Sequence, residues 1–136
     1  MNSELEVLTG SWEKRPGASR EVIGERERRL GFKFPTDYVD FMVVTNGASG
    51  DKEEIGIEID PIEEMAPDDK PLPYLDSIFR FGGDGAEEIF AFDARGDRVR
   101  IVMVRDSTNE EDILWQGDSF TRFVRNVPLY DPPPGK

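Results

Sequence analysis

The chain of 136 residues contains no cysteine and no histidine. Their absence excludes disulfides, thiolate nucleophiles, the common zinc sites, Ser–His and Cys–His pairs, and the usual side-chain proton carrier near neutral pH. An enzyme built from this chain would have to work with Asp, Glu, Lys or Tyr. Catalysis by a pair of carboxylates is the weakest of the functional hypotheses. We therefore expect a protein without catalytic activity and without a cofactor.

Long apolar runs are also missing, since no stretch approaches the roughly 20 residues needed to cross a membrane. The first residues, Met1-Asn2-Ser3-Glu4, lack the basic and hydrophobic regions of a signal peptide. The sequence therefore predicts a cytoplasmic protein with no membrane contact.

Positive charge is scarce, because 17 Lys and Arg face 29 Asp and Glu and the net charge is −12. Such a field repels nucleic acid and anionic membranes and attracts basic partners. The alternative is that the acidity serves solubility alone. With 37% hydrophobic residues, we expect one domain over residues 1–130 with its own core, and an extended, mobile, proline-rich tail over 131–136.

The segment Leu30–Gly47 predicts a helix end, a corner and a second helix. Gly31 can take the left-handed conformation that ends a helix beginning after Ser19, and Pro35 suits the first turn of the next helix. That helix has apolar residues at the spacing of one helix face, and Asn46-Gly47 tolerates the positive φ that ends it. The face consists of Tyr38, Phe41, Met42 and Thr45.

Alternating and continuous apolar patterns predict strands in the second half of the chain. The expected strands are Ile55–Ile59, Ile78–Phe81, Glu88–Asp93, Val99–Val104 and Ile113–Trp115. Residues 48–54 are predicted as a loop, Gly82-Gly83-Asp84-Gly85 as a hairpin turn, and Val99–Val104 as a strand buried on both faces. Ser119 is expected to cap a last helix that ends before Pro128. This order of elements predicts an α+β fold, with helices packed on one largely antiparallel (mixed) sheet.

The sequence patterns of several segments resemble those of the SUKH superfamily, which includes the Smi/Knr-type cell-wall assembly regulator and many bacterial immunity proteins. The resemblance rests on Leu30-Gly31, Phe34-Pro35, an apolar helix and Asn46-Gly47, with an upstream Trp, a glycine-rich acidic turn and a Ser-Phe-x-x-Phe helix. It implies a SUKH-like fold in which these residues are mostly structural. They are Trp12, Leu30, Gly31, Phe34, Pro35, Tyr38, Phe41, Asn46, Gly47, Phe120 and Phe123.

The resemblance also implies a protein-binding module. We expect an immunity protein that occludes a basic toxin domain, possibly a nuclease, with a cytoplasmic scaffold or regulator as the alternative. Neither a nucleic acid nor a small-molecule substrate is inferred.

Acidic residues are concentrated between Asp51 and Asp69, where nine carboxylates face Lys52 alone. Dense carboxylates suit fast association with a basic partner. The alternative is that this segment is simply a solvated surface. Together with the acidic turn, this segment supplies the candidate partner-binding residues: Glu53, Glu54, Glu58, Glu63, Glu64, Asp84, Glu87 and Glu88. A divalent cation at Asp84, Glu87, Glu88 and Asp93 is not favoured, because their spacing matches no EF-hand loop.

Overall fold

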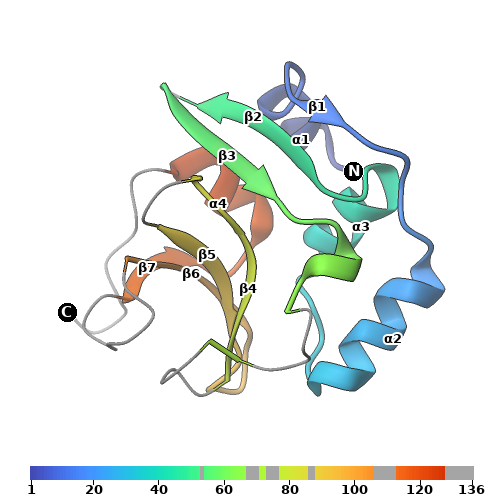
Figure 1. The fold of residues 1–136 in the computed structure, drawn as a ribbon, viewed down its shortest axis with the longest axis vertical. Helices are drawn as coiled ribbons and strands as arrows, with labels where there is room; N and C mark the ends of the chain where they lie inside the picture. The colour runs from blue at the N-terminus through green and yellow to red at the C-terminus, as the bar shows by residue number, and fades with distance from the viewer. Residues whose placement is uncertain (53, 67–70, 73–76, 86–87, 106–112, 128–136) are drawn as a thin grey trace.

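The computed structural model describes residues 1–52, 54–66, 71–72, 77–85, 88–105 and 113–127. All strands in these ranges belong to one seven-stranded sheet, in which each strand pairs antiparallel with its neighbours in chain order (Figure 1). The elements are α1 (Ser3–Leu8), β1 (Glu13–Lys14), α2 (Arg20–Leu30), α3 (Thr36–Val44), β2 (Ala48–Lys52), β3 (Ile55–Ile59), the 3-10 turn η1 (Ile62–Glu64), β4 (Ile78–Gly83), β5 (Ile89–Asp93), β6 (Arg100–Val104), β7 (Ile113–Gly117) and α4 (Phe120–Asn126). The predicted α+β class is confirmed. The predicted tail over 131–136 lies outside the described residues.

The helix–corner–helix forms as predicted. The side chain of Ser19 accepts a hydrogen bond from the Val22 N–H at the start of α2, and Gly31 ends the helix with φ of 86°. The Glu27 carboxylate then accepts the main-chain N–H of Phe34 at 2.8 Å. This bond fixes the corner, because it joins the last turn of α2 to the residue before Pro35.

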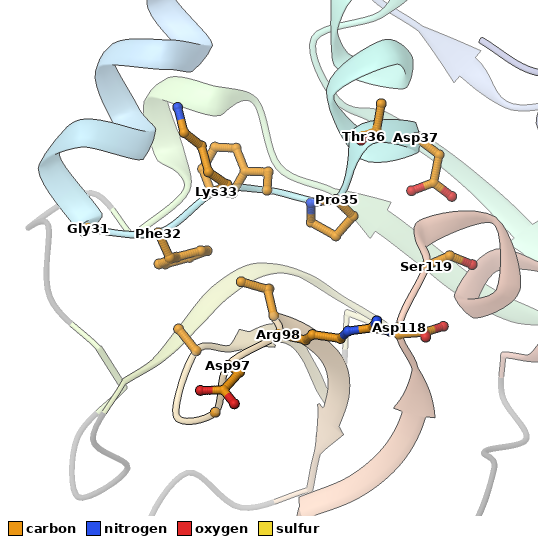
Figure 2. A pocket seen from close by; sticks show the side chains of 14 residues that line it. Gly31, Phe32, Lys33, Pro35, Thr36, Asp37, Asp97, Arg98, Asp118 and Ser119 are labelled. Atoms are coloured by element: carbon orange, nitrogen blue, oxygen red, sulfur yellow. The ribbon is translucent and has the colours of Figure 1, made fainter.

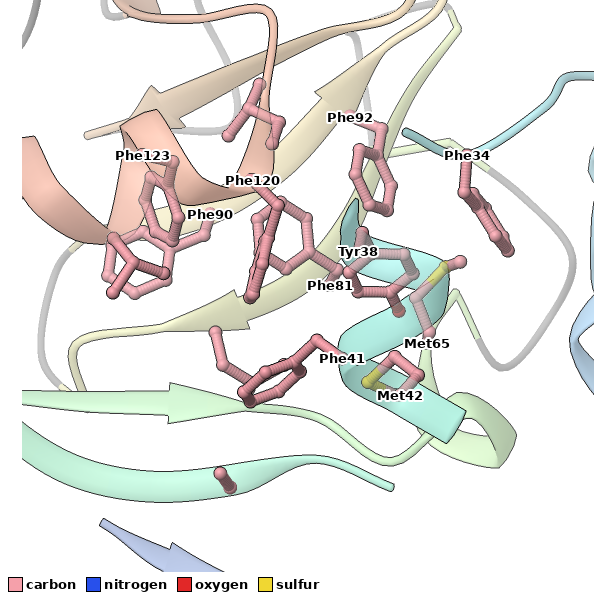
Figure 3. Close-up of a cluster of buried hydrophobic side chains, with 14 of the residues drawn as sticks. Phe34, Tyr38, Phe41, Met42, Met65, Phe81, Phe90, Phe92, Phe120 and Phe123 are labelled. Carbon is pink, nitrogen blue, oxygen red and sulfur yellow. The ribbon is translucent and has the colours of Figure 1, made fainter. Parts of the chain in front are cut away.

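A cluster of aromatic rings forms the main core between α3, α4 and one face of the sheet (Figure 3). The ring of Phe81 on β4 lies at its centre, 4.5 Å from Phe92, 5.6 Å from Phe123 and 5.8 Å from Tyr38 between ring centroids. Burial of aromatic side chains is the largest apolar contribution that a small domain can make. The signature residues Tyr38, Phe120 and Phe123 are all buried in this cluster.

The opposite face of the sheet carries a second, smaller apolar cluster. It is formed by Ile78, Ala91, Val102 and Val104. On β6, Ile101 and Met103 face the main core while Val102 and Val104 face this cluster. The prediction of a strand buried on both faces is confirmed.

Residues 48–52 form strand β2, so the loop predicted over 48–54 is wrong for these residues. The sequence Ala-Ser-Gly-Asp-Lys contains no strong β-former, but β2 pairs with β3 along its full length and with β1 at its start. Trp12 explains the glycine in this strand, because a Cβ on Gly50 would lie 2.2 Å from the indole. Trp12 itself is buried, as the structural interpretation of this residue requires.

Helix α4 is held at its N-terminus by two side chains. Ser119 accepts the N–H of Arg122, and Asp37 from α3 accepts the N–H groups of Phe120 and Thr121 at 3.1 and 2.7 Å. A carboxylate at a helix N-terminus is favourable for both hydrogen bonding and the helix dipole. Asp37 thus joins the two helices that cover the core. No helix in the described part of the chain is long and apolar enough to span a membrane.

Candidate partner-binding surface

Four of the predicted partner-binding residues lie on β3 or at its two ends, and two lie at the β4–β5 connection. Six of the eight are described, while Glu53 and Glu87 lie outside the described residues. One end of β3 is the tip of the β2–β3 hairpin, which projects at the upper left of Figure 1, and the other leads into η1. The structure therefore divides the acidic segment into two groups.

The first group consists of Asp51, Glu54 and Glu58, which we call the hairpin carboxylates. All three residues are exposed, and none forms an ion pair or hydrogen bond through its side chain within the described residues. Glu58 lies on the outer face of β3, since Ile57 and Ile59 on either side of it are buried in the core. Its partners across the sheet are small, Ser49 on β2 and Gly83 on β4. This face is open to a partner.

The second group lies on η1, where Glu63 already has a partner. Both oxygens of its carboxylate accept hydrogen bonds from Nδ2 of Asn46, at 3.1 and 2.9 Å, and Oδ1 of Asn46 accepts the N–H of Ile62 at 2.8 Å. Asn46 therefore links η1 to the end of α3. Glu64 is exposed.

The carboxylates near the β4–β5 connection are also engaged. Oδ1 of Asp84 accepts the N–H of Glu88 at 3.2 Å, and the Glu88 carboxylate pairs with Arg105 at 3.3 Å. These two residues stabilise the connection, and their oxygens are less available to a partner than those of the hairpin carboxylates.

Asp60, which leads from β3 towards η1, pairs with Arg80 at 3.3 Å. Burial raises the pKa of this carboxyl above its ordinary value, and the neighbouring Arg80 guanidinium offsets only part of that rise. Asp60 thus links the end of β3 to β4 through its ion pair with Arg80.

Glu54 adopts a left-handed backbone conformation with φ of 69°, which disfavours residues with a Cβ. Replacing Glu54 with glycine is expected to raise the free energy of unfolding by about 1 kcal/mol relative to Glu54→Gln, because glycine takes this conformation without strain. The glutamine variant removes the same charge and keeps the strain, so urea unfolding of the pair isolates the backbone effect. Equal stabilities would contradict it.

The described residues contain no group of three or more carboxylates that could hold a metal ion. Asp93, one of the metal ligands considered, is fully buried and binds two arginines instead. Its oxygens accept Nε and Nη2 of Arg95 at 3.0 and 2.9 Å and Nη2 of Arg100 at 2.9 Å. Burial alone would raise the pKa of Asp93, but these hydrogen bonds outweigh it and hold the pKa below its ordinary value.

A groove of about 800 Å³ lies at the other end of the molecule, between the corner 31–37 and the turn 94–99 (Figure 2). Asp118 and Ser119, before α4, complete its lining. The sequence did not indicate it, because its walls come from three segments far apart in the chain. The one sequence signal for the groove was Phe32, an aromatic residue directly after the helix end. In the structure its ring is only partly buried.

A search of curated proteins found no match to this chain. A comparison with protein-family models did find one, over residues 17–126. The matched range includes α2, the corner, the sheet from β2 to β7 and α4. It covers most of the chain, and we conclude that the protein belongs to the SMI1 / KNR4 family (SUKH-1).

Proposed function

We propose that the protein is a non-enzymatic binding module of the cytoplasm, and specifically an immunity protein that neutralises a cognate toxin by covering its active site or substrate groove. Membership of the SUKH-1 family supports a protein partner, since proteins of this family often bind other proteins. The partner is a basic toxin domain, such as a nuclease, whose surface complements a chain of net charge −12.

The observation that carries this proposal is the set of free hairpin carboxylates. Other described carboxylates of the acidic segment and its neighbouring turn are engaged: Asp60 by Arg80, Glu63 by Asn46, and Glu88 by Arg105. Asp51, Glu54 and Glu58 are exposed on a projecting hairpin and have no side-chain partner in the described part of the chain. Unpaired charges retain their full field for attracting a basic partner and lose no internal ion pair when it binds.

A scaffold or regulatory role is the second candidate. The groove between residues 31–37 and 94–99 favours it, because this surface is partly apolar and lies outside the acidic hairpin. A regulator that joins two proteins needs a second surface of this kind.

The decisive experiment is a calorimetric titration of the protein against the toxin domain encoded beside its gene, at low and high ionic strength. The double variant Glu54→Gln/Glu58→Gln is compared with the control Glu6→Gln/Glu21→Gln, which changes the net charge equally at exposed glutamates without partners in the described residues. We expect binding to weaken with salt and to weaken about tenfold in the hairpin variant only.

Equal weakening in both variants would show that net charge matters and the hairpin does not. Absence of binding by a folded protein would reject the immunity function and favour the scaffold.

A further inference from the structure

Three carboxylates hold in place the segments that form the walls of the groove. Glu27 holds the corner through the Phe34 N–H, Asp93 holds the base of the turn 94–99 through Arg95 and Arg100, and Asp37 holds the start of α4. Each is a charge-assisted contact, which is stronger than a neutral hydrogen bond. The groove is therefore preformed, and a ligand would not have to order its walls.

The floor of the groove is apolar and packs against the main core. The ring of Phe32 is half-buried and lies 5.4 Å from Phe34, 5.3 Å from Phe79 and 6.0 Å from Phe92. Val99, from the opposite wall, is also half-buried against the main core. A volume of this size, with apolar residues that remain partly exposed, is typical of a binding cleft.

The rim carries a defined charge pattern. Asp97 and Asp118 lie apart on the lower wall in Figure 2, with Arg98 between them, and all three are exposed. None of them has an ion-pair or hydrogen-bond partner among the described residues. Lys33 points away from the groove, towards α2, where it lies 3.8 Å from Glu27. Two unpaired carboxylates therefore flank one guanidinium.

The corner also offers main-chain groups. Within the described residues, the N–H and C=O groups of Phe32 and Lys33 make no hydrogen bond. Unpaired main chain along a groove can pair with the main chain of an extended peptide, which a small molecule does not reproduce along its length.

We propose that this groove binds an extended segment of a partner protein in which one aromatic residue is flanked by basic residues. The aromatic ring packs on Phe32 and Val99 with the Arg98 guanidinium against its face, a favourable cation–π arrangement. The two basic side chains pair with Asp97 and Asp118. This surface is distinct from the hairpin carboxylates, and the proposal holds whether or not the partner is a toxin.

The test uses the capped peptide acetyl-Gly-Arg-Trp-Arg-Gly-amide, titrated into the ¹⁵N-labelled full chain and followed by amide chemical shifts. We expect saturable shifts in residues 31–37 and 94–99. Replacing both peptide arginines with glutamate, or the tryptophan with alanine, should weaken binding about tenfold. The double variant Asp97→Lys/Asp118→Lys should weaken it similarly, whereas the equally charged control Asp51→Lys/Glu58→Lys should bind unchanged at the groove.

Saturable shifts at the groove that depend on tryptophan, arginine and the two rim aspartates would support the proposal. It is overturned by three other results: no saturable shifts, equal binding of the alanine peptide, or shifts centred on the β2–β3 hairpin that only the control variant removes. The last result would leave the proposed function standing, because it would assign basic-peptide binding to the hairpin alone.

Discussion

Replacing Tyr38 with alanine is expected to lower the free energy of unfolding by about 3–5 kcal/mol, whereas Tyr38→Phe is expected to raise it by up to about 1 kcal/mol. The ring is fully buried and lies 4.9 Å from Phe92 and 5.4 Å from Phe120, so its removal leaves a cavity. Its hydroxyl, in contrast, is buried and has no hydrogen-bond partner among the described residues.

The hydroxyl of Tyr38 also stays neutral, because burial raises its pKa well above the ordinary value and the nearby Asp60 carboxylate adds to that rise. An unpaired buried donor costs free energy that phenylalanine would not. Urea unfolding of both variants beside the wild type measures the two effects separately. A loss of stability in Tyr38→Phe would show that the hydroxyl has a partner, and a stable Tyr38→Ala would contradict the packing of α3 on the sheet.

The variant Asp93→Asn is expected to lower the free energy of unfolding by about 3 kcal/mol at neutral pH, because it breaks a buried ion pair and leaves two arginines without their carboxylate. The pKa of Asp93 is lowered in the folded state. The carboxylate therefore contributes stability above its ordinary pKa of about 4, and this contribution is lost as the pH falls through the lower, folded value.

Unfolding measured across acidic pH values tests this linkage. The wild type should lose stability at acid pH more steeply than Asp93→Asn, which lacks the titrating group. Asp97→Asn, an exposed substitution in the following turn, should stay within about 0.5 kcal/mol of the wild type. Parallel pH profiles for the wild type and Asp93→Asn would show that the buried pair does not carry the acid sensitivity.

Local signals predicted the elements whose patterns are strong. Helix α2 begins after Ser19 and ends at Gly31, as expected. The i, i+3, i+4 spacing correctly predicts that Tyr38, Phe41 and Met42 lie in the core. The β4–β5 hairpin formed as well, although Gly82 and Gly83 belong to β4 rather than to the turn. A β-bulge between Arg80 and Gly82 and the close approach of β3 explain this, since a Cβ on Gly82 would lie 2.3 Å from the Glu58 carbonyl oxygen.

Strand β2 could not be predicted because its stability comes from its neighbours. Its own residues have low β propensity, and it is held by β3 along one edge and by Trp12 packed on Gly50. The Nζ of Lys52 at its end also donates to the carbonyl oxygens of Arg125 and Val127. These contacts span much of the sequence and leave no local pattern.

The candidate surface was predicted only as a range of acidic residues. Composition identified the segment, but the division between free and engaged carboxylates depends on Asn46, Arg80 and Arg105, which lie elsewhere in the chain. Among the predicted residues that the structure describes, Glu54, Glu58 and Glu64 have no side-chain partner within the described part of the chain. Asp51, which was not predicted, has none there either. Apart from Phe32, the groove had no sequence signature, because its walls come from three separate segments of the chain.

The most direct test of the central claim is the catalytic activity of the neighbouring toxin domain, measured with increasing amounts of this protein. We predict that activity falls to background at an equimolar amount, and that Glu54→Gln/Glu58→Gln shifts the inhibition curve to higher concentration while Glu6→Gln/Glu21→Gln does not. A toxin that remains fully active in excess folded protein would contradict the immunity function.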